Sequence, residues 1–367
     1  MFFKLKLLIA AQNFYKSGFN ICFTEKKLKH SAVSFFLFIA IFAVSGCVPV
    51  KNKNVYEIPP QNDLRFYISD NNDESQIKKY FSKDPLERFG IQSVHFLKYM
   101  KELDGKENYS FYTPTAKDKF LIKKYVNQLP PLIKENLKKR VIGIYFINNF
   151  LSTGYTEWVT ASDGQIYSVI VLHPDVFRMT VSEIISRREE TCFKNESSSV
   201  RINIKAGGDE KALLYILLHE AVHAADYSYR ITDIDESVYI AATADLKKKF
   251  RPLDSYWKDQ RIPVAKYDFT NRDKLSFYGF RKGPHLEKNS VPELYESLLK
   301  SPFVSLYGAQ YGAEDLAELV TMYHLTEKMK YEYKVEVKDA SGKTKSFYPL
   351  SSPAVRERIE SIQFFYE

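Results

Sequence analysis

Cysteine is almost absent from this 367-residue sequence, and the three cysteines it has are poorly placed for cross-links. Cys22 and Cys47 fall within the first 50 residues, so Cys192 is the only cysteine in the remainder of the chain. One thiol forms no internal disulfide, and we expect Cys192 to be a small buried residue. Internal repeats are also missing. We therefore expect the roughly 320 residues after the N-terminal segment to bury one large or two medium cores.

A large excess of charge of one sign is also missing once the N-terminal segment is set aside. The whole chain has 53 basic and 45 acidic residues, but residues 1–46 hold six lysines and one glutamate. The rest of the chain therefore carries 47 basic and 44 acidic residues, a net charge of +3. This near balance is not typical of a nucleic-acid-binding surface, so we expect no nucleic-acid partner.

The N-terminal segment has the pattern of an export signal. Three lysines between positions 26 and 29 precede a 13-residue apolar core at 32–44. Val44-Ser45-Gly46-Cys47 follows and is similar to the lipobox of bacterial lipoproteins, in which the chain is cut before the cysteine and the thiol is acylated. We expect a signal peptide at 1–46, a lipidated Cys47 and a polar tether at 47–62. The alternative is an uncleaved anchor, because residues 31–50 form an uncharged run of 20 residues that could span a bilayer.

Histidine is scarce as well, yet two of the seven histidines stand in His219-Glu220-Ala221-Val222-His223, an H-E-x-x-H motif. By composition, chance would give this motif in roughly one such sequence in a hundred. Residues 211–229 contain no Gly or Pro and are apolar on nearly every side, which predicts a buried helix. On a helix, residues four apart share one face, so both imidazoles can bind one ion while Glu220 accepts a proton from water. The alternative is a pair of core histidines that are satisfied by hydrogen bonds.

Catalytic zinc sites usually take three protein ligands and leave one position for water. The sequence after His223 lacks the glycine and third histidine of the metzincin pattern. Residues 313–330 predict a helix on which Glu314 and Glu318 share a face, although charged residues opposite an apolar stripe are also typical of a solvated surface. His285, in a loop, and His324, on another face of the same helix, are the alternative ligands.

The combined motifs resemble the gluzincin metallopeptidases, in particular the catalytic domain of anthrax lethal factor. The shared pattern is H-E-x-x-H-x-x-D, then Y-G, five residues and E-x-x-A-E. The resemblance implies one Zn²⁺ bound by His219, His223 and Glu314. It also implies that Glu220 is the general base and that Tyr307 faces the reacting carbonyl. Asp226 and Glu318 are expected to accept hydrogen bonds from the ligand imidazoles and so orient them.

The order of the expected elements predicts an α+β, zincin-like fold with a mixed β-sheet, a buried H-E-x-x-H helix and a mainly helical C-terminal lobe. Periodicity predicts strands at 141–147, 156–160, 166–172 and 200–205. The second and third are joined by Ser162-Asp163-Gly164-Gln165, a hairpin turn signal. Further helices are expected at 85–103, 116–139 with a break at Pro130-Pro131, and 177–188. Five prolines in 231–305 predict short helices and loops. We divide the folded chain into residues 63–205 and a zinc-binding part at 206–367.

These observations predict a zinc endopeptidase tethered to the bacterial cell envelope, facing the periplasm or the outside, with the outer membrane favoured. Its partners would be a protein or peptide substrate and the membrane, through the lipid on Cys47. An extended peptide could pair with an edge strand, either in the 156–172 hairpin or at 200–205. Two alternatives stay open: a zinc amidase that cuts peptidoglycan crosslinks, and a non-catalytic zinc-binding lipoprotein that binds a partner.

Overall fold

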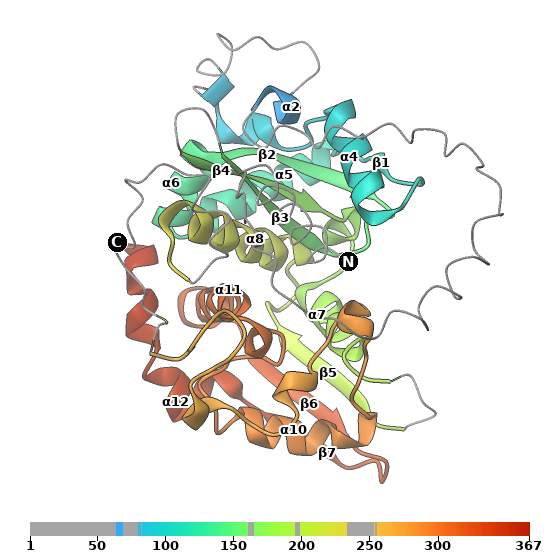
Figure 1. Cartoon of the computed structure of the whole chain (residues 1–367), viewed down its shortest axis with the longest axis vertical. Helices are drawn as coiled ribbons and strands as arrows, with labels where there is room; N and C mark the ends of the chain where they lie inside the picture. The colour runs from blue at the N-terminus through green and yellow to red at the C-terminus, as the bar shows by residue number, and fades with distance from the viewer. Residues whose placement is uncertain are drawn as a thin grey trace, which may run out of the picture. The chain divides into compact units, whose positions relative to one another are not determined.

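The strand at 141–148, which is apolar up to its last residue, lies inside the larger β-sheet (Figure 1). The computed structural model describes residues 64–68, 80–81, 83–160, 165–194, 199–232, 253 and 255–367. In it, β2 (Val141–Asn148) pairs in parallel with β4 (Ile166–Leu172), which pairs antiparallel with β3 (Gly154–Thr160). The short β1 (Ser110–Phe111) completes the order β1-β2-β4-β3. The mixed sheet and the antiparallel pairing of the predicted hairpin strands are therefore confirmed.

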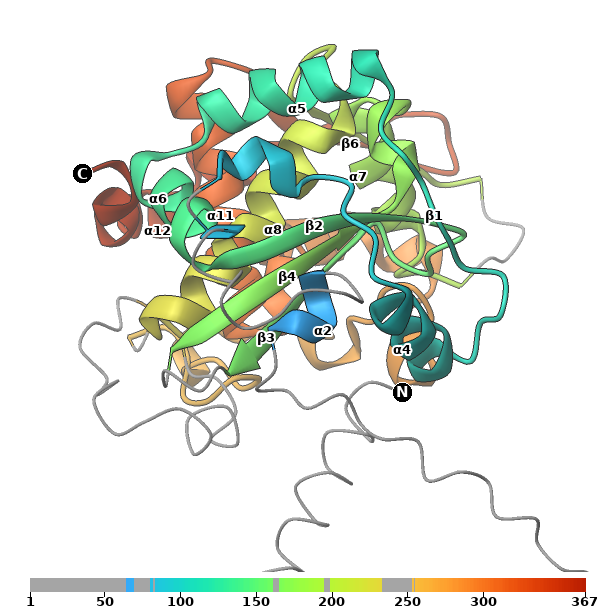
Figure 2. The ribbon, with the colours of Figure 1, turned by 90° about the horizontal axis from the view of Figure 1, so that it is seen from above.

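The larger sheet is covered on both faces, which explains why its inner strands are apolar throughout. Ile144 and Phe146 belong to the core on one face, while Tyr145 and Ile147 belong to the core on the other. Helices α2 (Arg65–Ile68) and α4 (Val94–Asp104) lie on the second face, and α8 (Ala212–Tyr229) lies on the first (Figure 2). The helix that carries the H-E-x-x-H motif is thus held directly against the sheet.

Helix α8 is the centre of the fold, as its sequence predicts. Every residue from 212 to 222 is buried, and the helix ends where Arg230 adopts a left-handed conformation with φ 56°. Helix α11 (Gly312–Tyr323) packs against α8 on the side away from the sheet and continues into a π-helical turn, His324–Lys328 (Figure 1). Helices α5 (Ala116–Gln128) and α6 (Pro131–Arg140) also contact α8, and they are separated at the predicted proline pair.

A second, three-stranded sheet lies in the C-terminal part of the chain. Strand β5 (Arg201–Ala206), as predicted, pairs antiparallel with β6 (Tyr333–Lys338), which pairs with β7 (Thr344–Phe347). Helices α7 (Val181–Glu190) and α10 (Val291–Leu298) pack on this sheet, and α12 (Pro353–Arg356) lies near the C-terminus. Neither β6 nor β7 is among the predicted strands, so the C-terminal part is less purely helical than predicted.

Two α-helices begin later in the chain than their predicted start positions. The expected helix at 85–103 is a 3₁₀ turn, Pro85–Arg88, followed by a break before α4. The break forms because Gly90, at φ 75°, donates its N–H to Ile144 O at 2.7 Å and so ties the chain to the sheet. The helix expected at 177–188 begins at Val181, after Thr180 and Glu183 form a capping box.

The structure is thus an α+β protein, and residues from its earlier and later halves share one hydrophobic core. Among the described residues, no helix combines the length and the apolar character needed to cross a bilayer. The expected signal peptide, the lipidated Cys47, the tether and the alternative anchor at 31–50 all lie outside the described residues.

Candidate metal centre

Three predicted ligands from two helices, up to 95 residues apart in sequence, meet between α8 and α11. His219 Nε2 lies 3.1 Å from Glu314 Oε2, and His223 Nε2 lies 3.4 Å from the same oxygen. The two Nε2 atoms are 3.2 Å apart, and the three ligand atoms all lie within 4.8 Å of one another. This group of two imidazoles and one carboxylate is arranged so that it could hold a metal ion.

The charges of the three residues are strongly coupled. Burial lowers the pKa of His219, but Glu314 and Glu318 outweigh burial and raise it to about 10. Burial raises the pKa of Glu314, but His223 and His219 lower it to about 2. Without a cation, the carboxylate is therefore ionised and His219 carries a proton. A metal ion would take the place of that proton, because only the neutral imidazole coordinates.

Glu220 lies next to the ligands and is held by strand β3. Its carboxylate Oε2 accepts a hydrogen bond from Thr156 Oγ1 at 2.7 Å. Gly154, at the start of β3, has no side chain to fill this space: an added Cβ would overlap Glu220 Oε1 and lie 2.8 Å from Ile216 Cγ2. Burial raises the pKa of Glu220, while His219 and His223 lower it. A buried carboxylate whose affinity for a proton is raised in this way is suited to accept one.

Tyr307 also lies where the sequence predicts, with its ring centroid 5.9 Å from that of His219. Phe277 packs against it edge-on at 5.1 Å, and the guanidinium of Arg188 stands 4.0 Å from the ring centroid. Burial and Glu314 raise the pKa of Tyr307, whereas Arg188 lowers it. Its hydroxyl makes no hydrogen bond to any residue in the described part of the chain, so it is available to a ligand.

Glu318 is completely buried, and several side chains donate hydrogen bonds to its carboxylate. Arg188 donates hydrogen bonds to both carboxylate oxygens, at 3.2 and 3.0 Å, and Ser305 Oγ donates to Oε2 at 2.7 Å. Tyr215 donates to Oε1. His219 Nδ1 lies 3.1 Å from Oε1, at ion-pair distance but without hydrogen-bond alignment. Glu318 is therefore close to a ligand imidazole, and its expected role of orienting that imidazole through a hydrogen bond stays a prediction.

Arg188 is the site residue that the sequence analysis missed. Its side chain is buried, it pairs with Glu318, and it donates to Tyr215 OH at 2.6 Å. In the sequence it stands between Arg187 and Glu189, where a run of charges is typical of a solvated helix end. Nothing local distinguishes Arg188 from its exposed neighbour Arg187.

Asp226 makes different contacts from those expected. Its Oδ1 accepts from Thr232 N at 2.7 Å and its Oδ2 accepts from Thr232 Oγ1 at 2.6 Å. These bonds secure the chain just after α8. In the described part of the chain, no hydrogen bond joins Asp226 to a ligand imidazole, so its orienting role stays a prediction.

The alternative histidine ligands lie elsewhere. His285 is exposed and contacts Arg281 O at 3.1 Å, while His324 stacks on Tyr366 at a centroid distance of 5.9 Å. Neither belongs to the ligand group found in the described residues. Cys192 is buried and free, as predicted.

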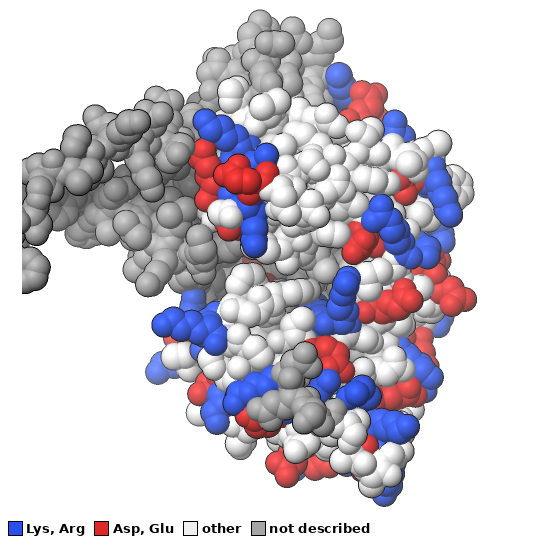
Figure 3. Space-filling view, turned by 90° about the vertical axis from the view of Figure 1, so that its right-hand side faces the viewer, with Lys and Arg blue, Asp and Glu red and all other residues white. Residues whose placement is uncertain are grey.

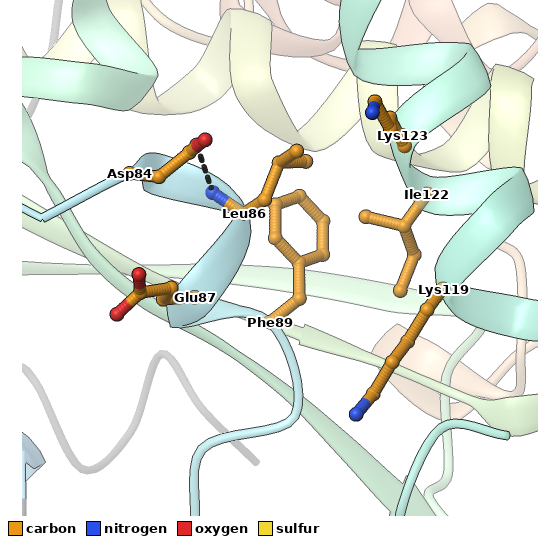
Figure 4. A pocket seen from close by; sticks show the side chains of 7 residues that line it. All are labelled: Asp84, Leu86, Glu87, Phe89, Lys119, Ile122 and Lys123. Atoms are coloured by element: carbon orange, nitrogen blue, oxygen red, sulfur yellow. Dashed lines mark hydrogen bonds between the residues drawn. The ribbon is translucent and has the colours of Figure 1, made fainter. Parts of the chain in front are cut away.

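A separate hollow of about 500 Å³ lies between the Pro85–Arg88 turn and α5 (Figure 4). Leu86, Phe89 and Ile122 form its apolar part, and Lys119 and Lys123 extend along the α5 side. None of the residues of the metal centre lines it, so it belongs to a different part of the surface. On the face drawn in Figure 3, basic and acidic side chains are interspersed, and no area of one charge dominates.

Comparison with known proteins found no matching family model, curated protein or solved structure.

Proposed function

We propose that this protein is a zinc-dependent endopeptidase of the gluzincin type on a zincin-like fold. The observation that carries the proposal is the group of His219, His223 and Glu314 ligand atoms, within 4.8 Å of one another. Two histidines and one glutamate form a known catalytic zinc ligand set, which leaves a position for water. Glu220, held by Thr156, and Tyr307 stand beside this group, and in the described part of the chain neither side chain forms an ion pair.

The residues around the ligands are suited to hydrolysis of a peptide bond. When bound, zinc would supply the Lewis acidity that activates water near neutral pH and polarises a carbonyl. Glu220, buried and fixed by Thr156, would take a proton from the attacking water and deliver it to the leaving amine. The Tyr307 hydroxyl would donate to the developing oxyanion. Loss of such a donor costs on the order of 10²–10³ in rate.

Strand β3 is the better of the two candidate strands for binding an extended peptide. It is one of the two outer strands of the larger sheet, Thr156 donates a hydrogen bond to Glu220, and Gly154 leaves the space that the Glu220 carboxylate needs. Strand β5, the other candidate, belongs to the second sheet. A peptide aligned along β3 would therefore pass the general base. We further propose, from the sequence alone, that lipidated Cys47 tethers the enzyme to the envelope, in the outer membrane.

The test uses the full-length chain, purified in detergent and loaded with zinc, against a peptide library and purified cell wall side by side. We expect peptide cleavage by the wild type, and unchanged zinc content but no turnover in Glu220→Gln. Glu135→Gln, an exposed glutamate paired with Lys139, is the matched control and should behave as wild type. Normal cleavage by Glu220→Gln would exclude this mechanism, and cleavage of cell wall alone would favour the amidase.

A further inference from the structure

Two hydroxyl groups that the proposed reaction does not use meet at the start of β3. Thr153 Oγ1 and Tyr278 OH lie 3.3 Å apart, although 125 residues separate them in the sequence. Each hydroxyl carries one proton, and a bond between them uses only one of the two. In the described part of the chain, neither side-chain hydroxyl makes another hydrogen bond. The pair therefore has one donor proton left for a ligand.

The pair lies at the edge of the candidate metal centre. Thr153 directly precedes Gly154, the residue against which the Glu220 carboxylate packs. Phe277, which directly precedes Tyr278, packs edge-on against Tyr307 at a centroid distance of 5.1 Å. Thr153 and Tyr278 are both only half-buried, in contrast to the buried Arg188 and Glu318 behind them. A ligand in the site could therefore reach the two hydroxyls.

Tyr278 is held in place by its backbone as well as its side chain. Its φ of 56° lies in the left-handed region, which a bulky residue rarely adopts. Its N–H donates to Thr191 Oγ1 at 3.0 Å, and Thr191 Oγ1 in turn donates to Arg188 O at 2.6 Å. The segment is thus fixed to the end of α7, the helix that carries Arg188. Uncommon backbone conformations that the surroundings enforce cluster at binding and catalytic sites.

We propose that the Thr153–Tyr278 hydroxyl pair is a substrate-binding position that donates a hydrogen bond to a backbone carbonyl of an extended peptide beside the cleaved bond. The inference rests on the proposed peptidase function and adds a substrate class: peptides long enough to continue past the metal centre along β3. An extended chain offers a carbonyl at every residue. Thr153 directly precedes β3, three residues before Thr156, so the spare proton of the pair is placed to meet one.

The experiment compares Tyr278→Phe and Thr153→Val in the full-length, zinc-loaded protein. Substrates are the best peptide of the library and a version truncated to the residues flanking the cleaved bond. Each variant should lower kcat/KM for the long peptide about three- to tenfold, the value of one hydrogen bond, with little change for the short one. Each single variant leaves one hydroxyl that its partner no longer orients, whereas the double variant removes both donors, so the double variant should lose at least as much as the larger single loss.

Tyr112→Phe is the matched control, since it also removes a tyrosine hydroxyl bond, to Asp118 Oδ2 at 2.7 Å. Zinc content and melting temperature check that the variants stay folded. If Tyr278→Phe does not fold, Thr153→Val alone decides. If the variants match Tyr112→Phe, or lose activity equally on long and short peptides, the inference is wrong while the peptidase function stands. If zinc-loaded wild type cleaves no library peptide, the proposed function fails and the inference fails with it.

Discussion

Replacing Glu318 by glutamine tests whether the core between α7, α8 and α11 depends on a buried ion pair. Arg188 and Glu318 are 6% and 0% exposed, and two hydrogen bonds of 3.2 and 3.0 Å join them. Glutamine keeps one oxygen acceptor but removes the charge, which leaves the Arg188 guanidinium buried without a countercharge. Breaking a buried pair in this way typically costs about 3–5 kcal/mol. That is a large part of the roughly 5–15 kcal/mol that holds most proteins folded.

The loss is measured by urea unfolding of the metal-free protein in a chelator, so that zinc binding does not add to the stability. The chain has only two tryptophans, and both are buried, so their fluorescence reports the unfolding. Glu135→Gln, whose partner Lys139 is exposed, should leave the midpoint unchanged. The double variant Arg188→Met, Glu318→Leu should recover much of the loss, because it leaves no unpaired charge in the core.

Zinc affinity provides a second measurement on the same variant. Glu318 Oε1 lies 3.1 Å from His219 Nδ1, so Glu318→Gln should also weaken zinc binding, by about 10–100-fold. A stability loss below about 1 kcal/mol, no larger than that of a surface substitution, would refute the burial argument. Unchanged zinc affinity would refute the claim that Glu318 orients His219.

Three further changes test other parts of the site. Since Glu314 and Glu318 raise the pKa of His219 to about 10, zinc binding at pH 8 should release about one proton from His219. Calorimetry in buffers of different ionisation enthalpy measures this proton release. Zinc binding without proton release would contradict the raised pKa of His219. Gly154→Ala should push Glu220 aside and reduce peptide cleavage at least about tenfold at unchanged zinc content, and full activity would contradict the packing. Burial raises the pKa of Glu189 to about 7, so it stays protonated in the folded state while the unfolded chain ionises from its ordinary value of 4.5 upward. The contribution of Glu189 to stability should therefore be complete below pH 4.5 and be lost as the pH rises to 7. Glu189→Gln should abolish this loss between pH 4.5 and 7, and an equal loss in both proteins would show another cause.

The sequence predicted those features whose signal is local and periodic. The apolar runs at β2 and β4, the unbroken α8 and the proline break between α5 and α6 all appear as expected, because each depends on the pattern of its own residues. The pairing of His219 and His223 was also predictable, since their spacing puts them on one helical face, whereas Glu314 as the third ligand was implied by the resemblance to gluzincins. That the two helices meet comes from tertiary packing, and the motif pattern only implied it.

The features that were missed depend on distant partners. Arg188 looks like a surface residue until Glu318, 130 positions later, is placed against it. The break before α4 requires the backbone of Ile144, which accepts from Gly90. Strand β6 is different: Tyr333, Val335 and Val337 are buried and alternate with less buried residues, so the signal was present in the sequence. The prediction of a mainly helical C-terminal lobe is therefore wrong for this segment.

The shortage of cysteine and the charges in the core are parts of one physical picture. In the described part of the chain the only cysteine is free and buried, so α8 and α11 are held together by packing and by charge. Arg188 compensates Glu318, whereas in the described part of the chain His219 and His223 are the cationic groups that lower the pKa of Glu314 and oppose the raised pKa of Glu220. An imidazole can balance the charge of a carboxylate only when a proton occupies the nitrogen lone pair that would otherwise bind a metal ion. A divalent cation balances the same carboxylates and leaves both imidazoles neutral. The group of His219, His223 and Glu314 could therefore hold a divalent cation, as the proposed function requires.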